Sequence, residues 1–305
     1  MSPSFDALAW GLGWSLLTLV VFALPLWPAW RELRSATDAD PLPIDDLDDG
    51  LTSYRARTVR AHLPRLETLP VEKRWPHANT RAVRVQEPLV LGQGQRAELL
   101  VSTSEVTLQP GSRVTRAVHA RRLRNQGMQL PLRASADETM VLEPGSRFFR
   151  ISASLILTTP LADAAPALPD EPASPAQPVT ERRFHKGPML VRVGQHVHAH
   201  LVIDGDLTLE ENASITGDVK VHGHVRLAKG AWLAGALFAQ GHVECAGYNR
   251  VQGPLCAEQA VHLGPHFQGG RSGSPCSISG WEVHLGESVR VFGSITAVTG
   301  GQVQA

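Results

Sequence analysis

Three polar side chains recur at equal intervals along the chain, at Asp206, His224 and His242. A carboxylate and two imidazoles are side chains that ligate zinc, and a histidine can act as the general base of an acyl transfer. On successive turns of a fold, however, they would lie about 4.8 Å apart along a line, whereas a metal needs ligands that converge on one point. We therefore predict a weak polar ladder on an outer wall, with no catalytic residue, no metal site and no cofactor.

This interval spans three units of a six-residue repeat, the hexad, which extends from Leu201 to His266. Apolar residues fill 21 of the 22 first and third positions of its hexads, and glycine recurs at the fifth position. An apolar-x-apolar triplet predicts a short strand with two inward side chains, and the glycine predicts a corner with positive φ or a close backbone approach. Three hexads complete one coil, and stacked coils form an all-β fold, a parallel β-solenoid. A helix is disfavoured, because this spacing wraps around a helix surface and each glycine would cost about 1 kcal/mol.

An apolar segment without charge precedes the repeat region, from Ala7 to Trp30. As a helix rising about 1.5 Å per residue it would be about 36 Å long, which suffices to cross a bilayer. We therefore predict one N-terminal transmembrane helix in a bacterial inner membrane, with a cleaved signal peptide and a buried helix as alternatives. Arg31 and Arg34 follow the segment, so the positive-inside rule places the C-terminal bulk in the cytoplasm, with the periplasm as the alternative.

A second stretch of short strands is predicted between residues 80 and 160. Two segments there resemble each other, EVTLQPGSRVTRA at 105–117 and TMVLEPGSRFFRI at 139–151. The offset between them is close to two solenoid turns of three hexads each, and both run from a strand into a turn made of Pro-Gly-Ser-Arg. We predict a degenerate solenoid, with a β-sandwich of short strands as the alternative.

These observations divide the chain into five segments. An anchor and a juxtamembrane linker come first, then the degenerate solenoid, a linker or insertion rich in proline and alanine, and the main solenoid. A Gly/Ser-rich break in the main solenoid predicts a loop that leaves its wall. The boundaries are residues 1–34, 35–79, 80–160, 161–185 and 186–299, with the loop at 267–282.

The composition argues against several kinds of partner. The 29 basic and 29 acidic residues balance, which argues against nucleic acid, and the absence of a phosphate-binding loop argues against a nucleotide. Three cysteines without CxxC spacing argue against a disulfide framework or a zinc site. Cys245 occupies an inward position, where we expect it to pack as a small hydrophobic residue.

The run VKVHGHVRL, with IDGDLTL and ITGDVKV before it, resembles the bactofilins, which are polymer-forming bacterial cytoskeletal proteins. The resemblance covers roughly residues 189–297. It implies a right-handed parallel β-helix, self-association through the solenoid ends, and a role in localising proteins of cell-envelope or exopolysaccharide assembly. Hexapeptide-repeat acyltransferases differ, because their glycine directly follows the second apolar residue, whereas one residue intervenes here.

A continuous apolar interior places function at the ends and outer wall of the solenoid. Phe267 and Phe292 lie near coil ends, and the resemblance implies that such an aromatic residue contributes to polymerisation. Trp232 and Phe238 occupy second positions, so we expect them to point outward and contact another copy or a partner. We predict a membrane-anchored, non-catalytic scaffold that associates with itself. A capped accessory subunit of a membrane complex and a hexapeptide-repeat acyltransferase are the alternatives.

Overall fold

The computed structural model describes residues 5–27, 80–159 and 179–304, which belong to two compact units, Met1–Gly50 and Leu51–Ala305. The predicted linker at 35–79 and most of the predicted linker at 161–185 lie outside the described residues.

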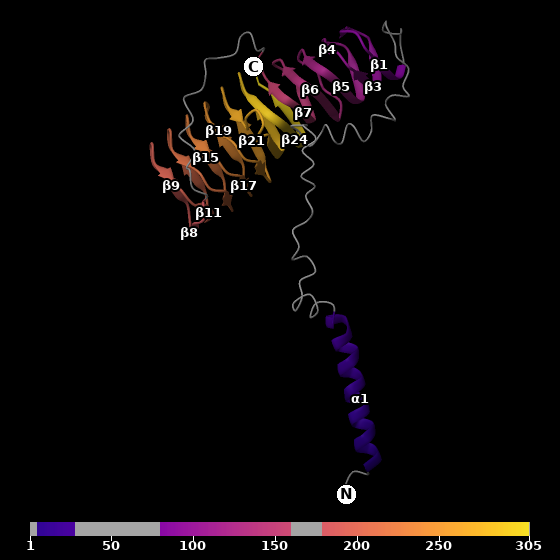
Figure 1. Cartoon of the computed structure of the whole chain (residues 1–305), viewed down its shortest axis with the longest axis vertical. Helices are drawn as coiled ribbons and strands as arrows, with labels where there is room; N and C mark the ends of the chain where they lie inside the picture. The colour runs from indigo at the N-terminus through magenta and orange to yellow at the C-terminus, as the bar shows by residue number, and fades with distance from the viewer. Residues whose placement is uncertain (1–4, 28–79, 160–178, 305) are drawn as a thin grey trace. The chain divides into compact units, whose positions relative to one another are not determined.

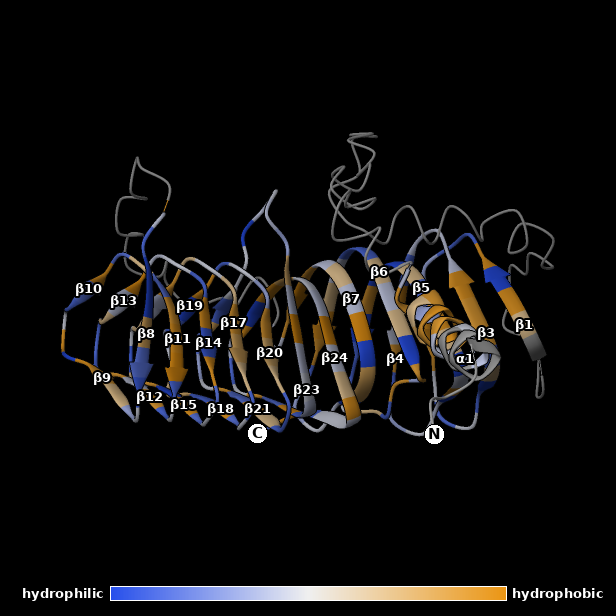
Figure 2. Ribbon diagram, turned by 90° about the horizontal axis from the view of Figure 1, so that it is seen from below, coloured by the Kyte–Doolittle hydropathy of each residue, from blue (hydrophilic) through white to orange (hydrophobic). Residues whose placement is uncertain are grey.

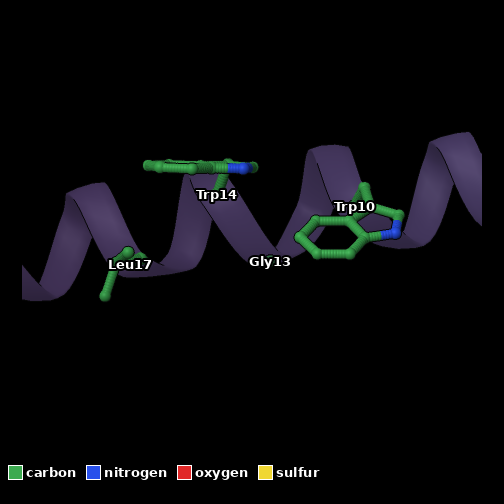
Figure 3. A pocket seen from close by; sticks show the side chains of 4 residues that line it. All are labelled: Trp10, Gly13, Trp14 and Leu17. Atoms are coloured by element: carbon green, nitrogen blue, oxygen red, sulfur yellow. The ribbon is translucent and has the colours of Figure 1, made fainter.

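The first unit contains helix α1 (Phe5–Ala23), followed by the 3-10 turn η1 (Leu24–Leu26). Trp10, Trp14 and Leu17 follow one another along the helix and remain exposed (Figure 3). In the described part of the chain, no helix combines the length and the apolarity needed to cross a membrane. The predicted span from Ala7 to Trp30 is corrected accordingly. The regular helix stops at Ala23 because the proline at position 25 lacks a backbone N–H and favours the tighter turn.

The second unit is a parallel β-solenoid of about 11 turns (Figure 1). Residues 80–159 form the part that we call the N-terminal solenoid. Glu105 aligns with Arg122, and Arg122 aligns with Thr139, so the two similar segments lie two turns apart as predicted, and the β-sandwich alternative is wrong. Its strands are β1 (Thr80–Val85), β2 (Leu89–Leu91), β3 (Arg96–Ser102), β4 (Glu105–Leu108), β5 (Arg113–Asn125), β6 (Arg133–Leu142) and β7 (Arg147–Leu157).

Residues 179–304 form the C-terminal solenoid. Each of its regular turns takes three hexads, as in the column Leu207, Val225, Val243 and Val261. The strands are β8 (Arg182–Lys186), β9 (Met189–Val191), β10 (His196–Val197), β11 (His200–Asp204), β12 (Leu207–Leu209), β13 (Ser214–Ile215), β14 (Val219–Val221), β15 (Val225–Leu227), β16 (Trp232–Leu233), β17 (Leu237–Ala239), β18 (Val243–Cys245), β19 (Arg250–Val251), β20 (Leu255–Ala257), β21 (Ala260–Leu263), β22 (Gln268–Gly269), β23 (Cys276–Leu285) and β24 (Arg290–Val303).

The first and third positions of the hexads line one continuous hydrophobic core. Asn249 is the single polar residue among these positions, and it is fully buried. Its amide donates to the carbonyl of Ala228 at 2.6 Å, and its Oδ1 accepts from the N–H of Gly247 at 2.8 Å. Because both ends of the amide are satisfied, the core tolerates this one polar side chain.

The corner glycines serve mainly to bring successive coils close together. A Cβ added to Gly217, Gly235 or Gly253 would collide with the backbone of the preceding coil, and none of the three has a positive φ. Gly205 and Gly247 do adopt positive φ, at 156° and 138°. An added Cβ would also collide with backbone atoms at Gly205 and Gly247, so close approach applies at these corners too and the backbone conformation is a second reason for glycine there.

The loop predicted at 267–282 is shorter than expected. Phe267 and β22 lie in the wall, and β23 resumes at Cys276, so only residues 270–275 leave it. Gly270 and Gly273 have φ of 70° and 80° and allow this tight excursion. The solenoid also extends past its predicted bounds, because β8 begins at Arg182 and β24 ends at Val303.

The two solenoids join into one stack at a single antiparallel pairing. Strand β24 runs antiparallel to β7, with Ile295 opposite Ile151 and Gln302 opposite Arg147. Both solenoids therefore meet at their C-terminal ends, and we call this junction the seam. In Figure 2 the strands stack from β10 at one outer end, through β24 and β7, to β1 at the other.

Candidate functional site

Asp206, His224 and His242, the residues of the polar ladder, are linked from one coil to the next. The N–H of His224 donates to Asp206 Oδ1 at 2.7 Å, and the N–H of His242 donates to His224 Nδ1 at 3.1 Å. The two imidazole rings stack with centroids 4.0 Å apart. Asp206 and His224 thus each accept a hydrogen bond from the backbone of the next coil at a corner, which stabilises the stacking of coils.

Other histidines also contact side chains of the adjacent coil. The Nδ1 atoms of His196 and His198 lie 2.8 Å from the hydroxyl oxygens of Ser214 and Thr216 on the next coil. Further along the stack, the rings of His262 and His284 stack with centroids 4.5 Å apart. The pKa of His262 is lowered, mainly by its burial and next by the nearby imidazole of His284. Among the described residues, no group of three or more His, Cys, Asp or Glu side chains is placed to hold a metal ion.

The four aromatic residues predicted as contacts have different environments. Phe267 is fully buried, because it occupies the first position of a further hexad and belongs to the core. Trp232 is only 3% exposed, so the expectation that it presents an exposed surface is wrong. Its register neighbours on adjacent coils are Ser214 and Arg250. Phe238 and Phe292 are half-buried, and Phe292 lies in β24, whose edge is paired with β7.

The outer coil formed by β8, β9 and β10 is the candidate contact surface that sequence reasoning missed. It carries three exposed apolar side chains, Phe184 at 61%, Leu190 at 53% and Val193 at 64%. Strand β8 pairs only with β11, and β9 only with β12, among the strands that the structure describes. This coil therefore presents unpaired backbone edges together with apolar side chains.

Most of strand β8 lies before the predicted start of the main solenoid at residue 186, because this strand departs from the hexad pattern. Arg183 aligns with Leu201, and His185 aligns with Ile203, so polar residues occupy two inward columns of this coil. Glu181 binds Arg183 at 2.6 Å, and this contact lowers the pKa of the carboxyl group. The triplet Met189–Val191 has the apolar-x-apolar form and lies within the predicted bounds, whereas β8 offers no such triplet as a signal.

The three cysteines differ in accessibility, which allows a direct test of the predicted inward positions. Cys245 is buried, and burial raises its pKa strongly; burial also raises the pKa of Cys276 to about 12. Cys256 is half-buried on an outer wall. Because the thiolate is the reactive form, we expect one thiol to react with a disulfide reagent in the folded protein and three to react in denaturant. The Cys256→Ser variant should lose the reaction in the folded state, and rapid reaction of two thiols in that variant would contradict these positions.

The fold defines the chain as a β-solenoid protein whose interior is filled by side chains. No protein-family model matches the chain, and neither a curated protein nor a solved structure shows similarity to it. The features of this chain that bear on its function are the seam, the outer coil and the outer walls.

Proposed function

We propose that the chain is a non-catalytic scaffold that associates with itself through the ends of its solenoids. The observation that carries the proposal is the seam. Within one chain, the last strand of one solenoid docks antiparallel against the last strand of another, over the length of β7 and β24. End-to-end docking is therefore a mode of association for which these coils are suited, since it extends the hydrogen-bonded ladder and the apolar core.

Since the seam occupies both C-terminal ends, self-association between copies would use an outer end. The coil of β8 to β10 is the better candidate, because three exposed apolar side chains lie within ten residues of one another. Arg182, Arg183 and Lys186 give this coil a positive charge, so two copies that meet there would repel at low salt. Screening should therefore strengthen the association as ionic strength rises.

The resemblance to bactofilins supports a role in localising other proteins, such as those of cell-envelope or exopolysaccharide assembly. In this proposal the long outer walls, with their regular polar columns, provide the surface on which partners are arranged.

A second candidate function is a capped accessory subunit that does not polymerise. It is favoured by Arg183 and His185, which place polar groups in inward columns of the end coil. Inward charges at the edge of a sheet are a device by which proteins prevent edge-to-edge pairing.

The two candidates differ in the particles that they predict. Light scattering over a range of concentrations, together with electron microscopy, should show dimers or longer assemblies for the scaffold. Replacing Phe184 and Leu190 with lysine should return the protein to the mass of one chain while circular dichroism shows that it remains folded. Leu132→Lys is a matched control, since Leu132 is 55% exposed but lies away from this coil. A single-chain mass at all concentrations and salt levels would refute self-association, whereas a compact trimer stabilised by acetyl-CoA would support the acyltransferase alternative.

A further inference from the structure

A pocket of about 300 Å³ opens at the seam between the two solenoids. Its lining comes from both sides of the junction. The N-terminal solenoid contributes Gln129, Arg147 and Phe149, and the C-terminal solenoid contributes Glu282, His284, Thr299 and Gln302. The pocket therefore exists only when the seam is formed.

An irregularity in the pairing of β24 with β7 produces this pocket. Arg150 lies opposite Thr296 and Phe148 opposite Gly301, so residues 297–300 of β24 face the single residue Phe149 of β7. Bulges of this kind bend a strand away from its partner and are frequent at binding sites. Thr299 is held in the bulge by a hydrogen bond of 2.8 Å from its hydroxyl to the carbonyl of Trp281.

The polar groups of the pocket combine donors and acceptors. His284 Nε2 lies 3.3 Å from Glu282 Oε2, and His284 Nδ1 lies 3.0 Å from the amide nitrogen of Gln302. A carboxylate only accepts, so Nε2–H donates to Glu282 and Nδ1 accepts from the amide. Arg147 and Glu282 are then the fully charged groups of the lining, and their charges are opposite in sign.

The charge balance restricts the class of ligand. An anion drawn to Arg147 would also face Glu282, and a cation drawn to Glu282 would face Arg147. Hydroxyl groups both donate and accept, so a neutral ligand with several hydroxyls can satisfy the carboxylate, the guanidinium and the amides together. The half-buried ring of Phe149 offers an apolar face to the carbon skeleton of such a ligand.

The volume limits the size of the ligand. Pockets for small molecules range over about 300–1,000 Å³, and this one is at the lower end. We propose that the seam pocket binds a small neutral polyhydroxylated ring, a monosaccharide unit, and that its occupancy holds the two solenoids together. This role is independent of the self-association proposed above, because the seam and the outer coil of β8 to β10 are separate surfaces.

The full chain can be tested with D-glucose, D-galactose and N-acetylglucosamine by saturation-transfer NMR and by thermal unfolding. We expect saturation transfer to at least one sugar, and an unfolding midpoint that rises with its concentration. Phe149→Ala and Arg147→Gln should each weaken binding at least tenfold. Glu244→Gln is a matched control, because Glu244 is an exposed carboxylate on the same wall and outside the pocket lining.

A second variant separates a sugar site from an anion site. Glu282→Gln removes the negative charge and leaves Arg147, so inorganic phosphate should bind this variant at least tenfold more tightly than it binds the unmodified chain. Circular dichroism would establish that each variant is folded. Failure of all three sugars to bind the unmodified chain, or tighter binding of phosphate than of sugar to it, would overturn the proposal.

Discussion

The Gly217→Ala variant is expected to lose about 3 kcal/mol of the free energy of unfolding, although it adds only one methyl group. A Cβ at this position would collide with the carbonyl group of Ala199 and the N–H of His200, which are backbone atoms of the preceding coil. A flexible side chain could move aside, but the backbone of the coil is fixed by its hydrogen bonds above and below. The coils would have to separate locally, which would weaken the ladder and the core beneath it. Urea unfolding measures the change.

Gly92→Ala provides the matched control for this prediction. Neither Gly92 nor Gly217 has a positive φ, so alanine is compatible with both backbones. At Gly92 the nearest atoms to an added Cβ are Gln109 Oε1 at 3.6 Å and Gln95 Oε1 at 3.8 Å, both ordinary contacts. Alanine there should leave stability within about 1 kcal/mol, or raise it slightly by restricting the unfolded chain. Equal effects at the two positions would show that close approach of the coils is not what requires glycine at the corner.

The local pattern of the sequence predicted the solenoid well, because each coil repeats the same chemical requirement. Two inward apolar residues and a glycine recur in most hexads, so a single departure from the pattern, such as the polar Asn249, does not obscure the period. The N-terminal solenoid repeats in the same way. Its turns are slightly shorter than three hexads, as the pairing of Thr80 with Ala97 shows, and the similar segments 105–117 and 139–151 lie two such turns apart. The polar ladder followed directly from the period, since residues three hexads apart must align on successive coils.

The seam could not be predicted in this way. It pairs strands that are distant in the sequence, such as those of Ile151 and Ile295, and antiparallel pairing leaves no periodic signal. The burial of Trp232 also depends on neighbouring coils rather than on its own position in the hexad. At the outer coil, Arg183 and His185 replace inward apolar residues, so the pattern ends before the fold does. The candidate surfaces that remain, the seam pocket and the outer coil, lie where the repeat is interrupted.

The Phe148→Ala variant is expected to uncouple the two solenoids. Phe148 is fully buried, and its ring packs against Gly301 of β24 at the seam. Removing a buried phenylalanine ring costs about 3–5 kcal/mol, and here the loss falls on the interface between two stacks. Because the stability of a solenoid is approximately a sum of neighbouring contacts, we expect one calorimetric transition to separate into two. Val90→Ala is the control, since Val90 is 56% exposed, lies in β2 away from the seam, and should change stability little.

Gly301→Val should produce the same separation from the other side of the seam, because an added Cβ would overlap the ring of Phe148. The double variant then tests whether the two residues act through one contact. Once the ring is absent, the valine side chain can occupy part of the space that it leaves, so the double variant should be at least about 1 kcal/mol more stable than the sum of the two single changes predicts. Additive losses would show that Phe148 and Gly301 contribute to the seam independently, and the assignment of the seam to their direct contact would then fail.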